Sequence, residues 1–165
     1  MTKISGQTRI VGVIGDPVQH SRSPQMHNAA IVERKLDYVY VPFHVRSGEL
    51  REAIEGFKAL NVLGVNVTIP HKQTVMPILD DVSHEATLIG AANTLLFCDG
   101  RVSGDNTDAQ GFLRAMTEEG IDIPVGGSAV VLGAGGAARA VVVALALSGL
   151  GLITVANRTG WKAIQ

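Results

Sequence analysis

The sequence has little of what would suggest secretion or a polyanionic partner. A single cysteine, Cys98, cannot form an internal disulfide, which fits a reducing compartment. The formal net charge is −1, so neither nucleic acid nor an anionic membrane surface is an expected partner. Residues 1–7 carry no apolar signal-peptide core. We therefore expect a cytoplasmic location.

Aromatic residues are also few, at 4% of the chain, whereas glycine occurs 19 times. With 46% hydrophobic residues, enough for a core, this composition favours an α/β protein with tight turns. Residues 140–156 carry no charge and imitate a membrane span. A span needs about 20 apolar residues, and Ser148-Gly149-Leu150-Gly151 would break the helix, so we expect a buried helix, a turn and a strand instead.

Strands and helices alternate in the first part of the chain. Apolar runs that end at turn residues predict buried strands over 9–14, 38–43 and 62–67. Helical spacing predicts helices over 25–36 and from Leu50 to Leu60, and Ser23 followed by Pro24 is the expected N-cap pair of the first. This order predicts a small mixed sheet flanked by helices.

The next part predicts short helices within 75–89, with Ser83 as a cap, and a hairpin that turns at Asp99-Gly100. A helix over 109–119 follows, and from Ser128 onward the residues are nearly all small and aliphatic. We place a domain boundary near residue 107. Residues 1–107 form a mixed-sheet α/β domain, and residues 108–165 form a connector helix and the start of a second domain.

Polar side chains lie where the predicted strands and helices begin or end. Lys72 follows a strand and opens a short helix, and four further groups share this position: Asn66, Thr68, Asn93 and Asp108. Such a set can hydrogen-bond a polyhydroxylated small molecule, and a lysine beside an aspartate can transfer a proton. The alternatives are a solvated Lys72 and an Asp108 that only favours the start of its helix.

Hydroxyls at a helix start offer a second kind of contact. Ser21 and Ser23 precede the first helix, where they can cap it, bind a carboxylate, or do both. The five histidines show no metal-ligand spacing, so we expect no metal.

A glycine motif lies between an apolar strand and an apolar helix. Residues 133–138 read Gly-Ala-Gly-Gly-Ala-Ala and match G-x-G-x-x-A, with tight-turn and pyrophosphate-facing glycines in the expected places. The next predicted strand ends at Asn157-Arg158-Thr159, where no carboxylate would repel a 2′-phosphate and Arg158 could bind it. The pattern favours NADP over NAD in a Rossmann-like domain. A flavin site, another nucleotide site or a structural turn are the alternatives.

Five blocks of sequence together resemble the shikimate dehydrogenase family. They are Gly15-Asp16-Pro17-Val18 with His20-Ser21-x-Ser23-Pro24 and His27-Asn28, Asn66-Val67-Thr68-Ile69-Pro70-x-Lys72, Gly90-Ala91-Ala92-Asn93-Thr94, Gly104-Asp105-Asn106-Thr107-Asp108 with Gly111, and Gly133-Ala134-Gly135-Gly136-Ala137 with Asn157-Arg158-Thr159. The resemblance implies NADPH-linked, reversible reduction of 3-dehydroshikimate to shikimate, in the pathway to chorismate and the aromatic amino acids.

The resemblance also implies residue roles. Ser21 and Ser23 would hold the substrate carboxylate, and Asn66, Thr68 and Asn93 its hydroxyls. Lys72 and Asp108 would handle the proton at the reacting carbonyl, with Asp108 also contacting substrate. The cofactor would lie against residues of the glycine loop and of the turn after the next strand: Gly133, Ala134, Gly135, Gly136, Ala137, Asn157, Arg158, Thr159 and Lys162.

The sequence departs from the family in two ways. Lys162 stands where the family has an arginine, and a point charge binds phosphate less specifically than a guanidinium fork. Family members also continue well past Gln165, so the resemblance implies a truncated second domain. If the 165 residues are the whole molecule, helix 137–149 should expose apolar surface and favour a homodimer. The alternatives to a shikimate dehydrogenase are a non-catalytic shikimate-binding fragment and an enzyme that also accepts quinate.

Overall fold

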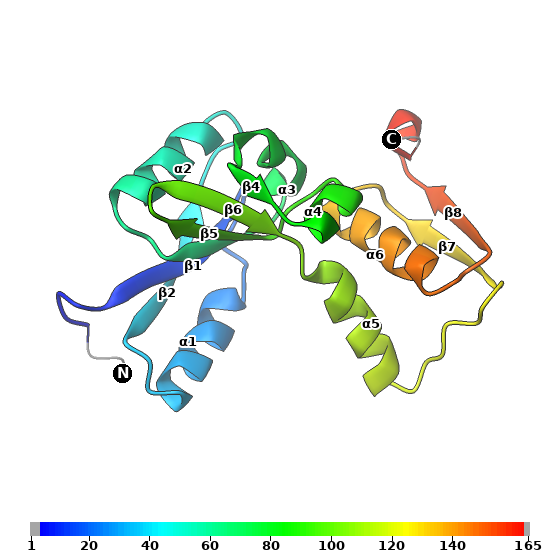
Figure 1. The fold of residues 1–165 in the computed structure, drawn as a ribbon, viewed down its shortest axis with the longest axis horizontal. Helices are drawn as coiled ribbons and strands as arrows, with labels where there is room; N and C mark the ends of the chain where they lie inside the picture. Colours follow the sequence, from blue (N-terminus) through cyan, green and yellow to red (C-terminus); the bar gives the residue numbers. More distant parts are fainter. Residues whose placement is uncertain (1–3, 164–165) are drawn as a thin grey trace. The chain divides into compact units, whose positions relative to one another are not determined.

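The computed structural model describes residues 4–163, without the side chain of Lys162, and its contacts divide them into two compact units (Figure 1). The first unit contains residues 4–83 and 92–105, and the second contains residues 84–91 and 106–163. Residues 84–91 thus belong to the second unit although they precede the last two strands of the first.

A six-stranded mixed sheet forms the centre of the first unit. Its spatial order is β2 (Tyr38–His44), β1 (Arg9–Gly15), β3 (Gly64–Val67), β5 (Thr94–Cys98), β6 (Arg101–Asp105) and β4 (Asp81–Val82). Strands β2, β1 and β3 are parallel, β5 is antiparallel to both β3 and β6, and β4 is parallel to β6. The predicted mixed sheet, its first three strands and the Asp99-Gly100 hairpin are confirmed.

One long helix covers each face of this sheet (Figure 1). Ile31 of α1 (Ser23–Glu33) is buried against Val13 and Tyr40 on one face. On the other face, Phe57 of α2 (Leu50–Ala59) has its ring centroid 4.8 Å from that of Phe43 and 6.0 Å from that of Phe97. Because side chains alternate along a strand, Tyr40 and Phe43 of β2 reach opposite helices.

Two details of the predicted elements were wrong. Ser23 is the first residue of α1, and Arg22 holds the N-cap position without a side-chain capping hydrogen bond. The segment between the short helices contains the edge strand β4. This strand exists because two of its residues pair with β6, and it has no sequence periodicity of its own. The helices around it are α3 (His71–Thr74), a 3₁₀ turn over Met76–Ile78 and α4 (His84–Ile89).

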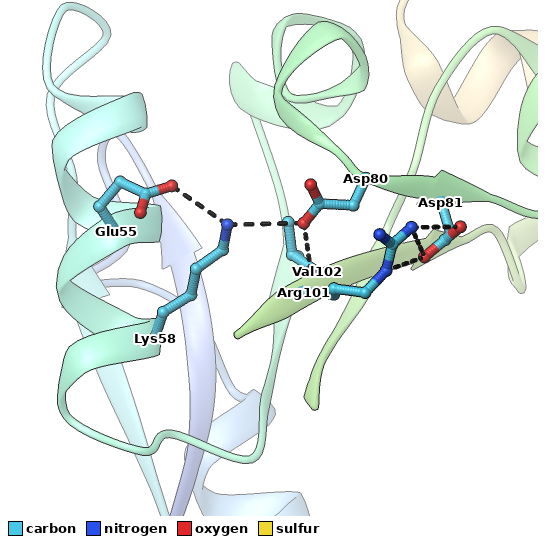
Figure 2. A network of polar contacts seen from close by, with 6 residues as sticks. All are labelled: Glu55, Lys58, Asp80, Asp81, Arg101 and Val102. Carbon is cyan, nitrogen blue, oxygen red and sulfur yellow. Dashed lines mark hydrogen bonds and ion pairs between the residues drawn. The ribbon is translucent and has the colours of Figure 1, made fainter. Parts of the chain in front are cut away.

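A polar network attaches α2 to the edge of the sheet (Figure 2). Nζ of Lys58 lies 3.1 Å from Oε1 of Glu55 and 3.5 Å from Oδ2 of Asp80. The same Asp80 oxygen accepts a 2.7 Å hydrogen bond from the backbone N–H of Val102 on β6. Beside it, the guanidinium of Arg101 binds the carboxylate of Asp81 at 2.8 Å. The short strand β4 is therefore held by side chains as well as by its ladder.

The second unit has helices packed on a two-stranded parallel sheet. Its elements are α4, α5 (Asp108–Glu118), β7 (Ser128–Leu132), α6 (Gly136–Leu147), β8 (Leu152–Ala156) and a 3₁₀ turn over Gly160–Ala163. The predicted β7, α6 and β8 are confirmed within one or two residues. A small core joins α4, α5 and α6 through residues that are mostly alanine: Ile89, Ala91, Ala109, Ala140 and Ala144. Among residues 4–163, no helix has both the length and the apolar character needed to cross a bilayer.

Candidate functional site

The turns that follow β1 and β3 are in close contact. The N–H of Asp16 donates to the carbonyl oxygen of Ile69, and the N–H of Thr68 donates to that of Ile14, both at 2.9 Å. A Cβ added at Gly15 would lie 2.5 Å from Cγ2 of Thr68 and 3.1 Å from the Ile69 carbonyl oxygen. Only glycine leaves room for Thr68 at this point, so the two parallel strands deliver their end turns to one place.

Backbone hydrogen bonds hold the turn that carries Lys72. The N–H of His71 donates to the carbonyl oxygen of Thr68 at 2.9 Å, and the carbonyl oxygen of Lys72 accepts from the N–H of Ala92 at 2.8 Å. The backbone carbonyl oxygen of Asn93, the residue after Ala92, accepts a 2.8 Å hydrogen bond from the N–H of Val67. The structure therefore brings together the segments of three predicted site residues of the first unit: Thr68, Lys72 and Asn93.

His71 is a structural residue that the sequence interpretation did not single out. Its side chain is fully buried, and its Nε2 lies 2.6 Å from the carbonyl oxygen of Val45. Because a carbonyl can only accept, Nε2 carries the proton in this contact. The ring ties the Lys72 turn to the end of β2. Its place between Thr68 and Lys72, two predicted site residues, was the available signal.

A second set of contacts surrounds Tyr40 and involves Ser21, Ser23 and Asn66. The Ser23 N–H donates to Oγ of Ser21 at 3.3 Å, so the two predicted carboxylate ligands are neighbours. The Ser23 side chain lies beside the phenol of Tyr40, and the Tyr40 hydroxyl donates to Oδ1 of Asn66 at 2.7 Å. Sequence reasoning missed Tyr40, which reads as an ordinary buried strand residue.

Two pKa shifts mark the electrostatics of this region. Burial raises the pKa of Tyr40 to about 12, although the nearby Ser23 side chain opposes the shift, so the phenol keeps its proton at neutral pH. At the end of β1, the His44 ring hydrogen-bonds the Asp16 carboxylate at 2.8 Å and lowers the pKa of Asp16. The β1 turn therefore carries an ionised carboxylate at neutral pH.

Asp108 lies in the second unit, at the first position of α5. Its N–H donates to Oδ1 of Asn106 at 2.9 Å, and Nδ2 of Asn106 donates to the carbonyl oxygen of Ala91 at 2.8 Å. The almost fully buried Asn106 thus fixes the start of α5 to the end of α4. The pairing of Asp108 with Lys72 stays a prediction.

The glycine loop of the second unit has the local geometry of a phosphate-binding turn. Gly133 follows β7 with φ at 112°, a value that favours glycine, and its N–H donates to the carbonyl oxygen of Ala156 at 2.8 Å. Gly135 is the extended N-cap of α6, and a Cβ added there would meet no atom within 4 Å. A pyrophosphate fits this open loop at a helix N-terminus. Gly136 and Ala137 form the first turn of α6, with Ala134 in the loop before it.

The predicted adenosine-side residues follow β8. Nδ2 of Asn157 donates to the carbonyl oxygen of Thr159 at 2.8 Å, which closes a turn around the exposed Arg158. The side chain of Lys162 lies outside the described residues. Among the residues that the structure describes, no three His, Cys, Asp or Glu side chains form a group that could hold a metal ion.

Comparison with known proteins gives consistent matches. The family profile described as shikimate dehydrogenase substrate binding domain matches residues 13–95. A relative from Desulforamulus reducens, named shikimate dehydrogenase (NADP(+)), is 52% identical over 161 residues, or 98% of this chain and 55% of that protein.

Solved structures agree with the sequence relatives. The shikimate dehydrogenase of Aquifex aeolicus is 47% identical with a TM-score of 0.89, over 98% of this chain and 60% of that one. The shikimate 5-dehydrogenase of Thermus thermophilus, in complex with NADP(H) and shikimate, is 42% identical with a TM-score of 0.86, over 94% and 58%. The chain spans about half the length of the curated relatives it matches.

Proposed function

The chain belongs to the shikimate dehydrogenase family, and on this premise we propose that it forms the substrate-binding and proton-transfer part of an NADP-dependent shikimate dehydrogenase. The reaction is the reversible reduction of 3-dehydroshikimate to shikimate. The observation that carries the proposal is the clustering, within one compact unit, of the turns after β1 and β3 with the segment that enters β5.

Substrate binding falls to the first unit. Ser21 and Ser23 offer hydroxyl donors next to each other at the start of α1, a suitable seat for the ring carboxylate. Thr68, Asn66 and Asn93 come from neighbouring strand ends and bind the ring hydroxyls through a hydroxyl and two carboxamides. A carboxamide both donates and accepts, so it matches a hydroxyl in either role.

Lys72 and Asp108 handle the proton. In the reducing direction the carbonyl oxygen gains a proton from this pair as the carbonyl carbon gains a hydride, which NADPH supplies when bound. In the oxidising direction the pair removes the proton from the substrate hydroxyl. Positioned proton transfer of this kind contributes about 10²- to 10⁴-fold to a rate.

The second unit binds the cofactor. The backbone N–H groups of residues 133–137, at the start of α6, would hold the pyrophosphate. Asn157, Arg158 and Thr159 receive the adenosine 2′-phosphate, with Arg158 as the cationic partner and Lys162 as a further positive charge. No carboxylate lies in this turn to oppose the phosphate.

A cytoplasmic location and self-association belong to the same proposal. Cys98 is exposed as a free thiol, which fits a reducing environment. Apolar side chains of the second unit are strongly exposed, among them Leu132 at 82% and Leu147 at 71%, and pairing of two copies would cover such surface. Light scattering across a concentration series is expected to show a homodimer.

The test of the function is shikimate-dependent formation of NADPH by the purified chain and by any longer product of the same reading frame. We expect turnover with a kcat/KM on shikimate that exceeds that on quinate. Shikimate binding without turnover in either form would support a non-catalytic binding fragment. A higher kcat/KM on quinate would support the broader enzyme, and no binding in either form would contradict the proposal.

A further inference from the structure

A directed chain of hydrogen bonds crosses one face of the first unit's sheet. It begins at the Tyr40 hydroxyl, which donates to Oδ1 of Asn66 at 2.7 Å. Nδ2 of Asn66 lies 3.3 Å from Oγ1 of Thr94, whose hydroxyl donates to Oδ1 of Asn93 at 2.9 Å. Two members, Asn66 and Asn93, are proposed substrate ligands.

The direction of this chain follows from the backbone carbonyl of Asn93, which can only accept. Nδ2 of Asn66 lies 3.4 Å from that carbonyl oxygen, so the NH₂ group of Asn66 faces β5 and its Oδ1 faces Tyr40. The Tyr40 hydroxyl donates its one proton to Oδ1 at 2.7 Å. Without the phenol, Oδ1 of Asn66 would lose the partner that holds this end of the carboxamide.

The ring of Tyr40 is itself held in place independently of its hydroxyl. The side chain of Asn28 binds both backbone groups of Tyr40, at 3.0 Å to the N–H and 2.8 Å to the carbonyl oxygen. The His27 ring stacks on Tyr40 with centroids 4.3 Å apart and planes within 9°. Only 4% of Tyr40 is exposed. Removal of the hydroxyl alone should therefore leave the ring where it is.

We propose that Tyr40 is a positioning residue of the substrate site, which holds the Oδ1 end of the Asn66 carboxamide so that this side chain keeps one orientation toward a substrate hydroxyl. The proposal rests on the proposed function for the identity of the substrate. Tyr40 also borders a cavity of about 260 Å³, together with Asn66 and Thr94, so these groups lie at an accessible surface rather than in a sealed core.

The first test is the affinity of the full chain for shikimate, measured by calorimetry, in the parent and in Tyr40→Phe. We expect Kd to rise about three- to tenfold, the loss typical of one hydrogen bond between neutral groups, with the Kd for NADP⁺ unchanged. Tyr38→Phe is the matched control, because Tyr38 lies on the same strand and borders the same cavity but takes no part in the hydrogen-bond chain.

A double-mutant cycle tests whether Tyr40 acts through Asn66. In the Asn66→Ala background, Tyr40→Phe should weaken shikimate binding no further. Equal Kd values for Tyr40→Phe and Tyr38→Phe, or full additivity with Asn66→Ala, would overturn the positioning role while leaving the proposed function intact.

The second test needs no ligand. The side-chain amide signals of Asn66 in a ¹H–¹⁵N spectrum should shift in Tyr40→Phe and stay in place in Tyr38→Phe. If the parent fails to bind shikimate, the proposed function fails, and these signals still decide the orientation of Asn66. Unchanged signals in Tyr40→Phe would overturn the inference in either case.

Discussion

The carbonyl oxygen of Lys72 accepts a 2.8 Å hydrogen bond from the backbone N–H of Ala92, the residue before Asn93. Together with the bond from His71 to Thr68, this contact holds the Lys72 turn through backbone groups. The turn should therefore keep its place when the Lys72 side chain is replaced, so that substitutions there report on chemistry rather than on folding.

Lys72→Ala is expected to lower kcat for shikimate oxidation by about 10²-fold or more while KM changes little, because the variant loses the proposed proton-transfer group but keeps the proposed binding hydroxyls and amides. Steady-state kinetics measure both constants. Gln73→Ala, at the exposed neighbouring position of the same short helix, should match the parent. An unchanged kcat in Lys72→Ala would remove this side chain from the reaction.

Gly15→Ala should disturb the proposed substrate site by displacing the turn after β3. The new Cβ would meet Thr68 at 2.5 Å, so the β3 turn must shift, at a cost of about 1–3 kcal/mol of unfolding free energy. The Kd for shikimate should rise in parallel, because Thr68 and Lys72 share that turn. Gly48→Ala is the matched control, since a Cβ there meets no atom within 4 Å.

Chemical denaturation and calorimetry on the two glycine variants give both quantities. Equal stability and equal shikimate affinity for Gly15→Ala and Gly48→Ala would show that the close approach of β1 and β3 does not shape the site.

Arg158→Ala should weaken NADP⁺ binding and leave NAD⁺ binding unchanged. Loss of a charge-assisted contact to the 2′-phosphate is expected to raise the Kd for NADP⁺ about 10- to 100-fold. Arg114→Ala removes an exposed arginine that pairs with Glu118 on α5, and serves as the charge-matched control. A parallel loss of affinity for both cofactors would place Arg158 away from the 2′-phosphate.

The network at the edge of the sheet predicts an acid-dependent loss of stability. The N–H of Val102 lowers the pKa of Asp80 below its usual value of 3.8, partial burial opposes this, and Lys58 adds to the lowering. The stabilisation is therefore complete above pH 3.8 and is lost as the pH falls through the lower folded-state pKa. Asp80→Asn should be less stable than the parent at neutral pH, and the difference should narrow in acid.

Thermal unfolding from neutral pH down to about pH 3 measures that difference. Glu33→Gln, which removes an exposed carboxylate from the end of α1, is the control for charge loss alone. A difference in thermal stability between Asp80→Asn and the parent that stays constant with pH would contradict the stabilising role of the ionised Asp80.

Much of the fold was predictable because its signals are local. Apolar runs such as residues 9–14 and the Asp99-Gly100 turn encode β1 and the hairpin directly, and both residues of that turn have positive φ. Strand β4 was missed because its two residues are defined by their partner on β6. The predicted N-cap of α1 was one residue off because the helix already includes Ser23, whose N–H donates to Oγ of Ser21.

The segments of the proposed site could be predicted from the sequence, but the residues that support them could not. Thr68 and Lys72 stand out because polar residues directly follow an apolar strand. Tyr40 and His71 act through contacts with Asn66 and with Val45, residues distant in sequence, and a tyrosine in a strand or a histidine in a turn gives no periodic signal of such a contact. Residues that position others become visible only once the strands are placed side by side.

We propose that Lys72 and Asp108 act on the same substrate oxygen, and a crystal structure of the protein with shikimate bound would show whether they do. Nζ of Lys72 and a carboxylate oxygen of Asp108 should both lie within about 2.6–3.2 Å of one ring hydroxyl. A bound shikimate with either side chain turned to the opposite side of the molecule would contradict it.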